Sequence, residues 1–211
     1  MNSAKSSRLN VDIAVVAVAT LLFSLSLALR AHVNIWLTIG VSAVLLLATT
    51  TFGRGELPLW GRFRPLIGIG IGIGAGVLMA IVTHLAYPLA ARLVPSIAVE
   101  VAGLYEDLRQ TPGPVLGAPF LLLAVAAEEA VWRGVLVRQM EKTRGPLVIV
   151  LVATLAYAVP QAFSGSWVLV LVALGCGAFW TFLRVWSRSL VVPALTHAVW
   201  NLVVFVALPL H

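Results

Sequence analysis

Charged side chains are scarce in this sequence: Asp, Glu, Lys and Arg make up only 10% of its 211 residues. Soluble domains carry about 25% charged residues. Together with a mean hydropathy of +1.03, this shortage excludes an ordinary soluble domain and indicates an integral membrane protein. Cysteine is almost absent as well. The single Cys176 lies in an apolar segment, so it excludes a disulfide framework within one chain and is interpreted as a small packing residue.

Several motifs are also missing. The sequence contains no glycine-rich P-loop, no zinc-finger spacing and no clustered basic helix, so its net charge of +6 does not indicate nucleic-acid binding. It supplies no serine or cysteine placed beside a base as a nucleophile. The excess positive charge instead predicts cytoplasmic loops that set the topology of a membrane protein.

Seven apolar segments approach the length of about 20 residues that an α-helix needs to cross the hydrocarbon core. They are Val11–Leu29, Val33–Phe52, Leu66–Leu89, Val115–Val137, Pro146–Phe163, Trp167–Val185 and Leu190–Leu208. We therefore predict an all-α, polytopic transmembrane bundle of about seven spans, formed as a single membrane domain over residues 1–211. The first segment follows Lys5 and Arg8 as a signal peptide would, but its length and the later spans predict a retained anchor.

Basic residues divide unequally between the two ends of these spans. With the N-terminus in the cytoplasm, eleven lie on the cytoplasmic side and three, Arg30, Arg92 and Arg109, on the opposite side. The eleven are Lys5, Arg8, Arg54, Arg62, Arg64, Arg133, Arg138, Lys142, Arg144, Arg184 and Arg188. This bias predicts a cytoplasmic N-terminus, with His211 outside, and we expect a bacterial inner (plasma) membrane.

The segment Ala90–Gly113 differs from the spans because charged residues alternate with apolar ones along it. Leu93, Ile97, Val101 and Leu104 recur at helical spacing. This pattern predicts an amphipathic helix lying on the outer surface of the membrane.

Glycines recur every four residues in the third segment, at Gly68, Gly72 and Gly76, with a second row at Gly70 and Gly74. Such rows let two helices approach closely in lipid. A phosphate-binding loop is the other interpretation, but no strand precedes the glycines and no Lys-Ser/Thr follows them. We therefore predict helix packing.

Two carboxylates and an arginine, Glu128, Glu129 and Arg133, interrupt the apolar stretch AVAAEEAVWRGVL. A charge at membrane depth costs at least about 2.5–3.5 kcal/mol. Glu129 and Arg133 are four residues apart on one helix face, so they can pair. Glu128 points about 100° away and has no cation on its own face. An acid placed in this way indicates a functional group.

A second polar pair lies in the last span, where His197 and Asn201 share one helix face. At 1.5 Å of rise per residue, both lie near the bilayer midplane, as does Glu128. Gln161 follows Pro160 and comes out somewhat nearer the outer face. His32, His84 and His211 map to the interfaces and are not assigned to the site.

An acid, an imidazole and an amide at the midplane suit a hydrolytic site. Glu128 could take a proton from water as a general base. His197 and Asn201 could donate hydrogen bonds to the oxyanion of a tetrahedral intermediate. Arg133 could hold Glu129, which would then support the helix.

The motif EExxxRG beginning at Glu128, followed by HxxxN beginning at His197, resembles the CPBP intramembrane proteases. These are the CAAX-processing endopeptidases and bacteriocin-processing enzymes, also called the Abi family. The similarity covers about Val115–Phe205, which we take as the catalytic core. It implies a bundle of about eight membrane helices, a cavity within it, and cleavage of a peptide bond inside the membrane.

Carried onto this chain, the resemblance makes Glu128 the glutamate that activates water. Glu129 and Arg133 would be its supporting pair, and His197 and Asn201 would flank the substrate carbonyl. The expected partners are the lipid bilayer and a membrane-embedded or lipidated peptide substrate.

The middle motif departs from that family, which usually has Phe-x-x-x-His where this chain has Tyr157-Ala-Val-Pro-Gln161. Glutamine cannot act as a base and is a poor zinc ligand. The family has been described both as metalloproteases and as metal-independent glutamate proteases. Because a zinc site usually needs three protein ligands, we favour the metal-free mechanism without a cofactor, with Gln161 positioning the water.

Two other functions stay open. The chain could be a catalytically weak relative that binds a membrane peptide as a chaperone, immunity or scaffold protein, and the Gln161 exchange supports this. It could also be a transporter with Glu128 as its proton site. A transporter predicts an inverted repeat, whereas the buried polar residues fall only in the second half of the chain.

Overall fold

The structure is a computed structural model that describes residues 2–52 and 58–210, and it forms no strand within those ranges. The helices are α1 (Asn2–Ala28), α2 (Ile35–Phe52), α3 (Pro65–Leu93), α4 (Ser96–Arg109), α5 (Pro114–Glu128), η1 (Glu129–Leu136), α6 (Val137–Met140), α7 (Pro146–Ala162), α8 (Trp167–Ser187), α9 (Val191–Asn201) and η2 (Leu202–Ala207). The two η segments are π-helical turns that continue α5 and α9 without a break.

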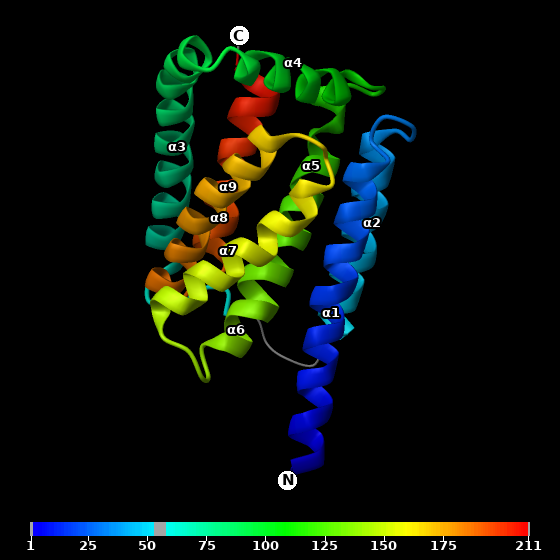
Figure 1. Cartoon of the computed structure of the whole chain (residues 1–211). Helices are drawn as coiled ribbons and strands as arrows, with labels where there is room; N and C mark the ends of the chain where they lie inside the picture. The colour runs from blue at the N-terminus through cyan, green and yellow to red at the C-terminus, as the bar shows by residue number, and fades with distance from the viewer. Residues whose placement is uncertain (1, 53–57, 211) are drawn as a thin grey trace.

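Most of these helices run side by side as a bundle, while α4 lies across the end opposite the N-terminus (Figure 1). Four helical stretches are long and apolar enough to cross a membrane: Asn10–Ala28, Pro65–Leu93, Pro114–Met140 and Trp167–Ser187. Three shorter apolar helices are Ile35–Thr50, Pro146–Ala162 and Val191–Ala207. The all-helical, polytopic fold is confirmed, and the total of seven spans stays a prediction.

The surface of the bundle is apolar and part of its interior is polar, which is the reverse of a soluble protein. Leu66, Leu85 and Leu147 have 82%, 75% and 72% of their surface exposed. Glu129 and Arg133, by contrast, are fully buried. A lipid solvent explains this distribution, because it accepts leucine on the outside and forces charged groups to find partners inside.

The amphipathic helix is shorter than predicted. Helix α3 continues through residue 93, and α4 begins only at Ser96, so the first residues of Ala90–Gly113 belong to α3. Val101 and Tyr105 are the buried residues of α4. The Tyr105 hydroxyl donates to the carbonyl oxygen of Val204 at 2.6 Å, and Asp107 forms an ion pair with Arg30. These contacts fasten α4 across the bundle end.

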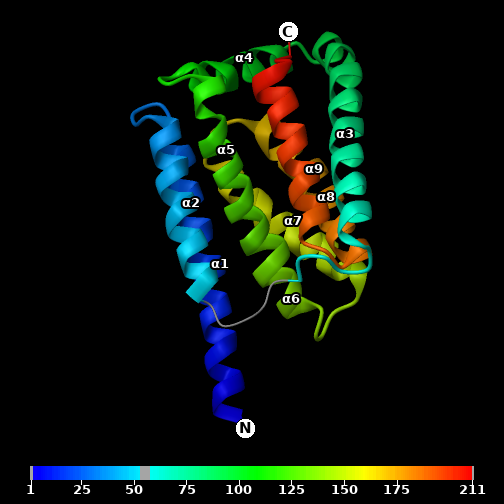
Figure 2. The ribbon, with the colours of Figure 1, turned by 180° about the vertical axis from the view of Figure 1, so that it is seen from behind.

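The predicted glycine row brings α3 against α9, and Figure 2 shows the two helices side by side. A Cβ atom added at Gly72 would lie 2.8 Å from the Cβ atom of Leu195. The Thr196 hydroxyl donates to the Gly72 carbonyl oxygen at 3.1 Å. In the second row, a Cβ added at Gly70 or Gly74 would meet no described atom within 4 Å. Only the first row is therefore a helix contact. It meets α9 at Thr196, the residue before His197.

Two of the eleven basic residues assigned to the cytoplasmic side are not loop charges. The side chains of Arg133 and Arg184 are 0% and 1% exposed and both form ion pairs. Removing them leaves nine residues against three (11 − 2 = 9). The side chains of Lys5, Arg8 and Arg54, and all of His211, lie outside the described residues. The cytoplasmic N-terminus stays a prediction.

The glycine contact predicts opposite effects for two neighbouring substitutions. In Gly76→Ala the new Cβ would lie 2.8 Å from the Thr196 carbonyl oxygen and 2.7 Å from the Val199 Cβ. Overpacking of this kind costs about 1–3 kcal/mol, so the thermal unfolding midpoint in detergent should fall. Gly74→Ala meets open space and gains helix propensity, so its midpoint should hold or rise. Equal midpoints for the two variants would contradict the packing role of the row.

Candidate active site

The centre of the site is one carboxylate oxygen that receives two donors from different helices. Oε1 of Glu129 accepts from Nη1 of Arg133 at 3.0 Å. The same oxygen lies 3.0 Å from Nδ1 of His197 in α9. Because an ionised carboxylate only accepts hydrogen bonds, this contact makes Nδ1 the protonated nitrogen of the His197 ring. Glu129 therefore fixes the orientation of the imidazole and joins η1 to α9.

Arg133 is held from several sides, as a charge in this setting requires. Its Nε donates to Oγ1 of Thr181 at 3.3 Å, and its Nη2 donates to the Gly177 carbonyl oxygen at 3.2 Å. The guanidinium also lies 4.5 Å from the centre of the Tyr157 ring. Arg133 and Glu129 are thus the supporting pair that the i, i+4 spacing predicts, extended by contacts from α8 and α7.

Glu128 lies on the other side of the imidazole. Its Oε2 is 3.9 Å from Nε2 of His197, and 13% of its side chain is exposed, against 1% for Glu129. The Tyr157 ring lies beside this pair and meets the His197 ring edge-on. Glu128 is therefore the more exposed of the two carboxylates, while Glu129 is enclosed by its partners. The two neighbouring acids have different surroundings, as the 100° between them predicts.

Aromatic rings enclose the histidine. The Trp180 ring stacks on the His197 ring with centroids 3.6 Å apart and an angle of 18°. The Tyr157 ring meets His197 edge-on at 6.4 Å. Trp132 in turn packs edge-on against Tyr157 at 6.5 Å. This wall leaves the imidazole little freedom to rotate, so Nδ1 stays on Glu129 and Nε2 stays on the side of Glu128.

Both polar helices change their winding at the site. The π-helical turn η1 begins at Glu129, and η2 begins at Leu202, directly after Asn201. A π turn widens the helix and is frequent at functional sites. We found no feature of the sequence that predicts either turn.

The structure brings together four of the six predicted site residues: Glu128, Glu129, Arg133 and His197. Asn201 is buried one turn after His197, and Gln161 is buried at the end of α7. Within residues 2–52 and 58–210, no side-chain hydrogen bond joins either residue to the four. On α7 it is Tyr157, one turn before Gln161, that packs against Arg133 and His197.

Sequence reasoning missed the role of Arg184. Its Nε donates to the carbonyl oxygen of Arg133 at 3.1 Å. Its two Nη atoms bind Oε1 and Oε2 of Glu141 at 3.1 and 3.2 Å. The predicted span ends at Val185, so the sequence places Arg184 beside a basic loop. Only the contacts with Arg133 and Glu141 show that Arg184 is buried and supports η1.

The fold and the site together define a helical membrane protein with a buried acid–imidazole centre. Residues 110–203, somewhat less than half of the chain, match the family model described as "Rce1-like: Type II CAAX prenyl endopeptidase Rce1-like". This match confirms the resemblance to the CPBP family and contains all six predicted site residues. No curated protein and no solved structure matches the chain.

The buried ion pair predicts a specific pattern of stabilities. Removing one partner leaves the other as an unpaired buried charge, which lowers the free energy of unfolding by about 3–5 kcal/mol. Glu129→Ala and Arg133→Leu should therefore each lower the unfolding midpoint in detergent strongly. The double variant should be less destabilised than the sum of the two, because neither charge remains. Simple additivity would show that the two side chains do not act as a pair.

Proposed function

We propose that this protein is an intramembrane endopeptidase that cleaves a membrane-embedded or lipid-anchored peptide. The observation that carries the proposal is the placement of Glu128, a partly exposed acid 3.9 Å from an imidazole that Glu129 orients. A base and a potential hydrogen-bond donor face the same point inside an apolar bundle. The family match points to the same reaction, since its description names a CAAX prenyl endopeptidase.

In the proposed reaction, the Glu128 carboxylate takes a proton from water as the water oxygen bonds to the substrate carbonyl carbon. The carbonyl oxygen becomes an oxyanion. When the C–N bond breaks, the proton passes from Glu128 to the leaving amine nitrogen, and the other product is a carboxylic acid. No covalent enzyme intermediate forms, in keeping with the absence of any described serine or cysteine side chain hydrogen-bonded to Glu128 or His197.

His197 and Asn201 are the proposed donors to the oxyanion. Because Nδ1–H of His197 is bound to Glu129, only Nε2 is available to the substrate. Nε2 donates only when the ring carries both protons. Asn201 supplies an amide N–H one turn further along the same helix.

Tyr157 is the second group proposed to act on Glu128. Its ring is fixed by Arg133 and Trp132 and meets His197 edge-on, close to the Glu128 carboxylate. The CPBP family, which this chain resembles, usually has phenylalanine at the position of Tyr157 and histidine at the position of Gln161. We propose that the Tyr157 hydroxyl orients Glu128, while Gln161 contributes to positioning the water.

The site does not fit a three-ligand zinc centre. Nδ1 of His197 is bound to Glu129, and Gln161 provides a weak amide donor where the family has an imidazole. Among the described residues no group of three His, Cys, Asp or Glu side chains is arranged to hold a metal ion. The two ring nitrogens of His84 lie 2.8 Å from the carbonyl oxygens of Ala80 and Leu208 instead. We therefore propose the glutamate mechanism and assign no step to a metal.

The substitution Glu128→Gln tests the base. It keeps the shape of the side chain and removes its ability to accept a proton, so cleavage should fall by at least about 100-fold while the unfolding midpoint changes little. Substrates would be identified by mass spectrometry of membrane peptides from cells with and without the protein. Retained cleavage in this variant would exclude the mechanism. If the wild type binds such peptides without cleaving them, the result would instead support the alternative function, a catalytically weak relative that binds a membrane peptide.

A four-variant cycle tests the roles of Tyr157 and Gln161. Tyr157→Phe removes only the hydroxyl and should lower cleavage by about 10-fold or more, as expected for losing one hydrogen bond to a charged group, worth about 1.5–3 kcal/mol. Gln161→His should keep or raise cleavage, and it should rescue activity when combined with Tyr157→Phe. Gln161→Leu serves as the matched control and should not rescue it. If Tyr157→Phe has full activity, the hydroxyl does not orient the base.

A further inference from the structure

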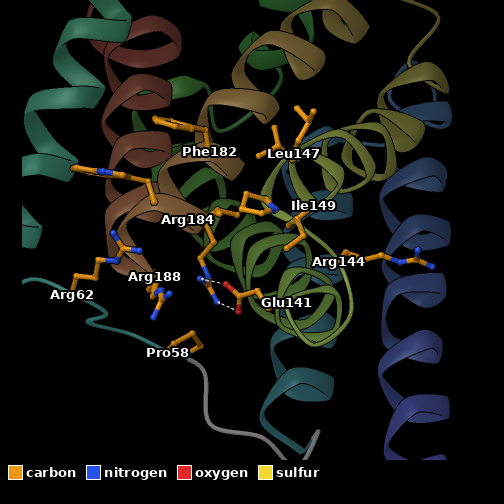
Figure 3. Close-up of a pocket in the computed structure, with 13 residues that line it drawn as sticks. Pro58, Arg62, Glu141, Arg144, Leu147, Ile149, Phe182, Arg184 and Arg188 are labelled. Atoms are coloured by element: carbon orange, nitrogen blue, oxygen red, sulfur yellow. Dashed lines mark hydrogen bonds and ion pairs between the residues drawn. The ribbon is translucent and has the colours of Figure 1, made fainter.

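A cavity of about 1000 Å³ opens at the end of the bundle that carries the N-terminus, between the start of α7 and the end of α8. Figure 3 shows Arg62 and Arg188 together on one side of it, with the Arg184–Glu141 pair beside them. Arg144 extends from the opposite side. This cavity is separate from the acid–imidazole site, and none of the six predicted site residues lines it.

The backbone holds the two arginines next to each other. The amide nitrogen of Arg62 donates to the Ser187 carbonyl oxygen at 2.9 Å, and the amide of Leu190 donates to the Pro58 carbonyl oxygen at 2.8 Å. Gly61, which lies between Pro58 and Arg62 in the sequence, adopts φ +60°. A Cβ atom added there would lie 2.4 Å from the carbonyl carbon of Arg188. The chain segments before α3 and before α9 are thus joined directly at this point.

Neither of these two guanidinium groups is paired with a carboxylate from the described part of the chain. Within the described residues no hydrogen bond or ion pair engages the side chain of Arg62 or Arg188. Glu141, the carboxylate that lines the cavity, is bound to both Nη atoms of Arg184. Arg188 also has φ 56°, in the left-handed region that non-glycine residues seldom occupy. Strain of this kind, in a rigid loop that brings like charges together, is typical of a binding site.

The remaining lining of the cavity is apolar and exposed. Phe182 and Leu147 have 52% and 72% of their surface exposed. In Figure 3 they lie on the side of the cavity away from Arg62 and Arg188, toward the middle of the bundle. A ligand that fits both parts carries an anionic group at one end and a hydrocarbon chain at the other.

We propose that this cavity binds the headgroup of an anionic phospholipid. The phosphate would lie between the guanidinium groups of Arg62 and Arg188, which bind phosphate oxygens in a bidentate geometry. An acyl chain would lie against Phe182 and Leu147. Basic pockets between membrane helices at the cytoplasmic side bind acidic lipid headgroups in this way. The proposal is independent of whether the protein cleaves peptides.

The chain offers a matched control in Arg64. It is exposed, lies two residues from Arg62 at the start of α3, and does not line the cavity. A general attraction between a basic surface and acidic lipid would depend on Arg64 as much as on Arg62. A built site would depend on Arg62 and Arg188 alone.

Native mass spectrometry of the purified full chain in detergent tests the site, with phosphatidylglycerol, phosphatidylcholine or inorganic phosphate added. We expect the wild type to retain phosphatidylglycerol in preference to phosphatidylcholine. Arg62→Gln combined with Arg188→Asn should weaken that binding about 30-fold, from roughly fivefold for each arginine. Asn is chosen at 188 because it tolerates the left-handed conformation. Arg64→Gln should bind as the wild type does.

Three outcomes would overturn the proposal: equal retention of both lipids, an equal loss in Arg64→Gln, or binding of inorganic phosphate as tight as that of phosphatidylglycerol. The last would identify a site for free phosphate. Arg62→Lys with Arg188→Lys keeps the charge and loses the planar fork, so it should retain part of the preference. If the Gln/Asn variant does not fold, the Lys variant and the single Arg62→Gln variant give the same comparison.

Discussion

One oxygen atom, Oε1 of Glu129, carries the constraint on which the site depends. It accepts from Arg133 on its own helix and from His197 on α9, each at 3.0 Å. A charged group inside the bilayer is tolerated only when it is paired, so both helices must meet at this atom. The pairing also leaves Nε2 of His197 facing Glu128, which is the more exposed of the two neighbouring acids.

The surrounding packing holds that geometry from three directions. On one side, the glycine row of α3 approaches the backbone of α9 next to His197. Trp180 of α8 stacks on the imidazole. Tyr157 of α7 lies under the Arg133 guanidinium and meets the imidazole edge-on. Small residues and aromatic rings therefore fix the positions of the polar side chains here, as a continuous hydrophobic core does in a soluble protein.

Arg184 connects the site to the end of the bundle. It binds the Arg133 carbonyl oxygen with one nitrogen and the Glu141 carboxylate with the other two. The same ion pair borders the cavity in which Arg62 and Arg188 lie. The polar interior thus extends from the acid–imidazole centre through the Arg184–Glu141 pair to the cavity at one end of the bundle.

The sequence by itself determined the class of the protein, the apolar helices, the Glu129–Arg133 pair and the glycine contact. These depend on span length and on residues three or four apart, which a local pattern expresses. Only the tertiary structure decided that His197 lies closer to Glu129 than to Glu128, that Tyr157 packs against Arg133 and His197, and that Arg184 is buried. Each depends on side chains from different helices. The π turns at Glu129 and Leu202 also rotate the later residues of each helix away from their α-helical positions, so periodicity could not place them.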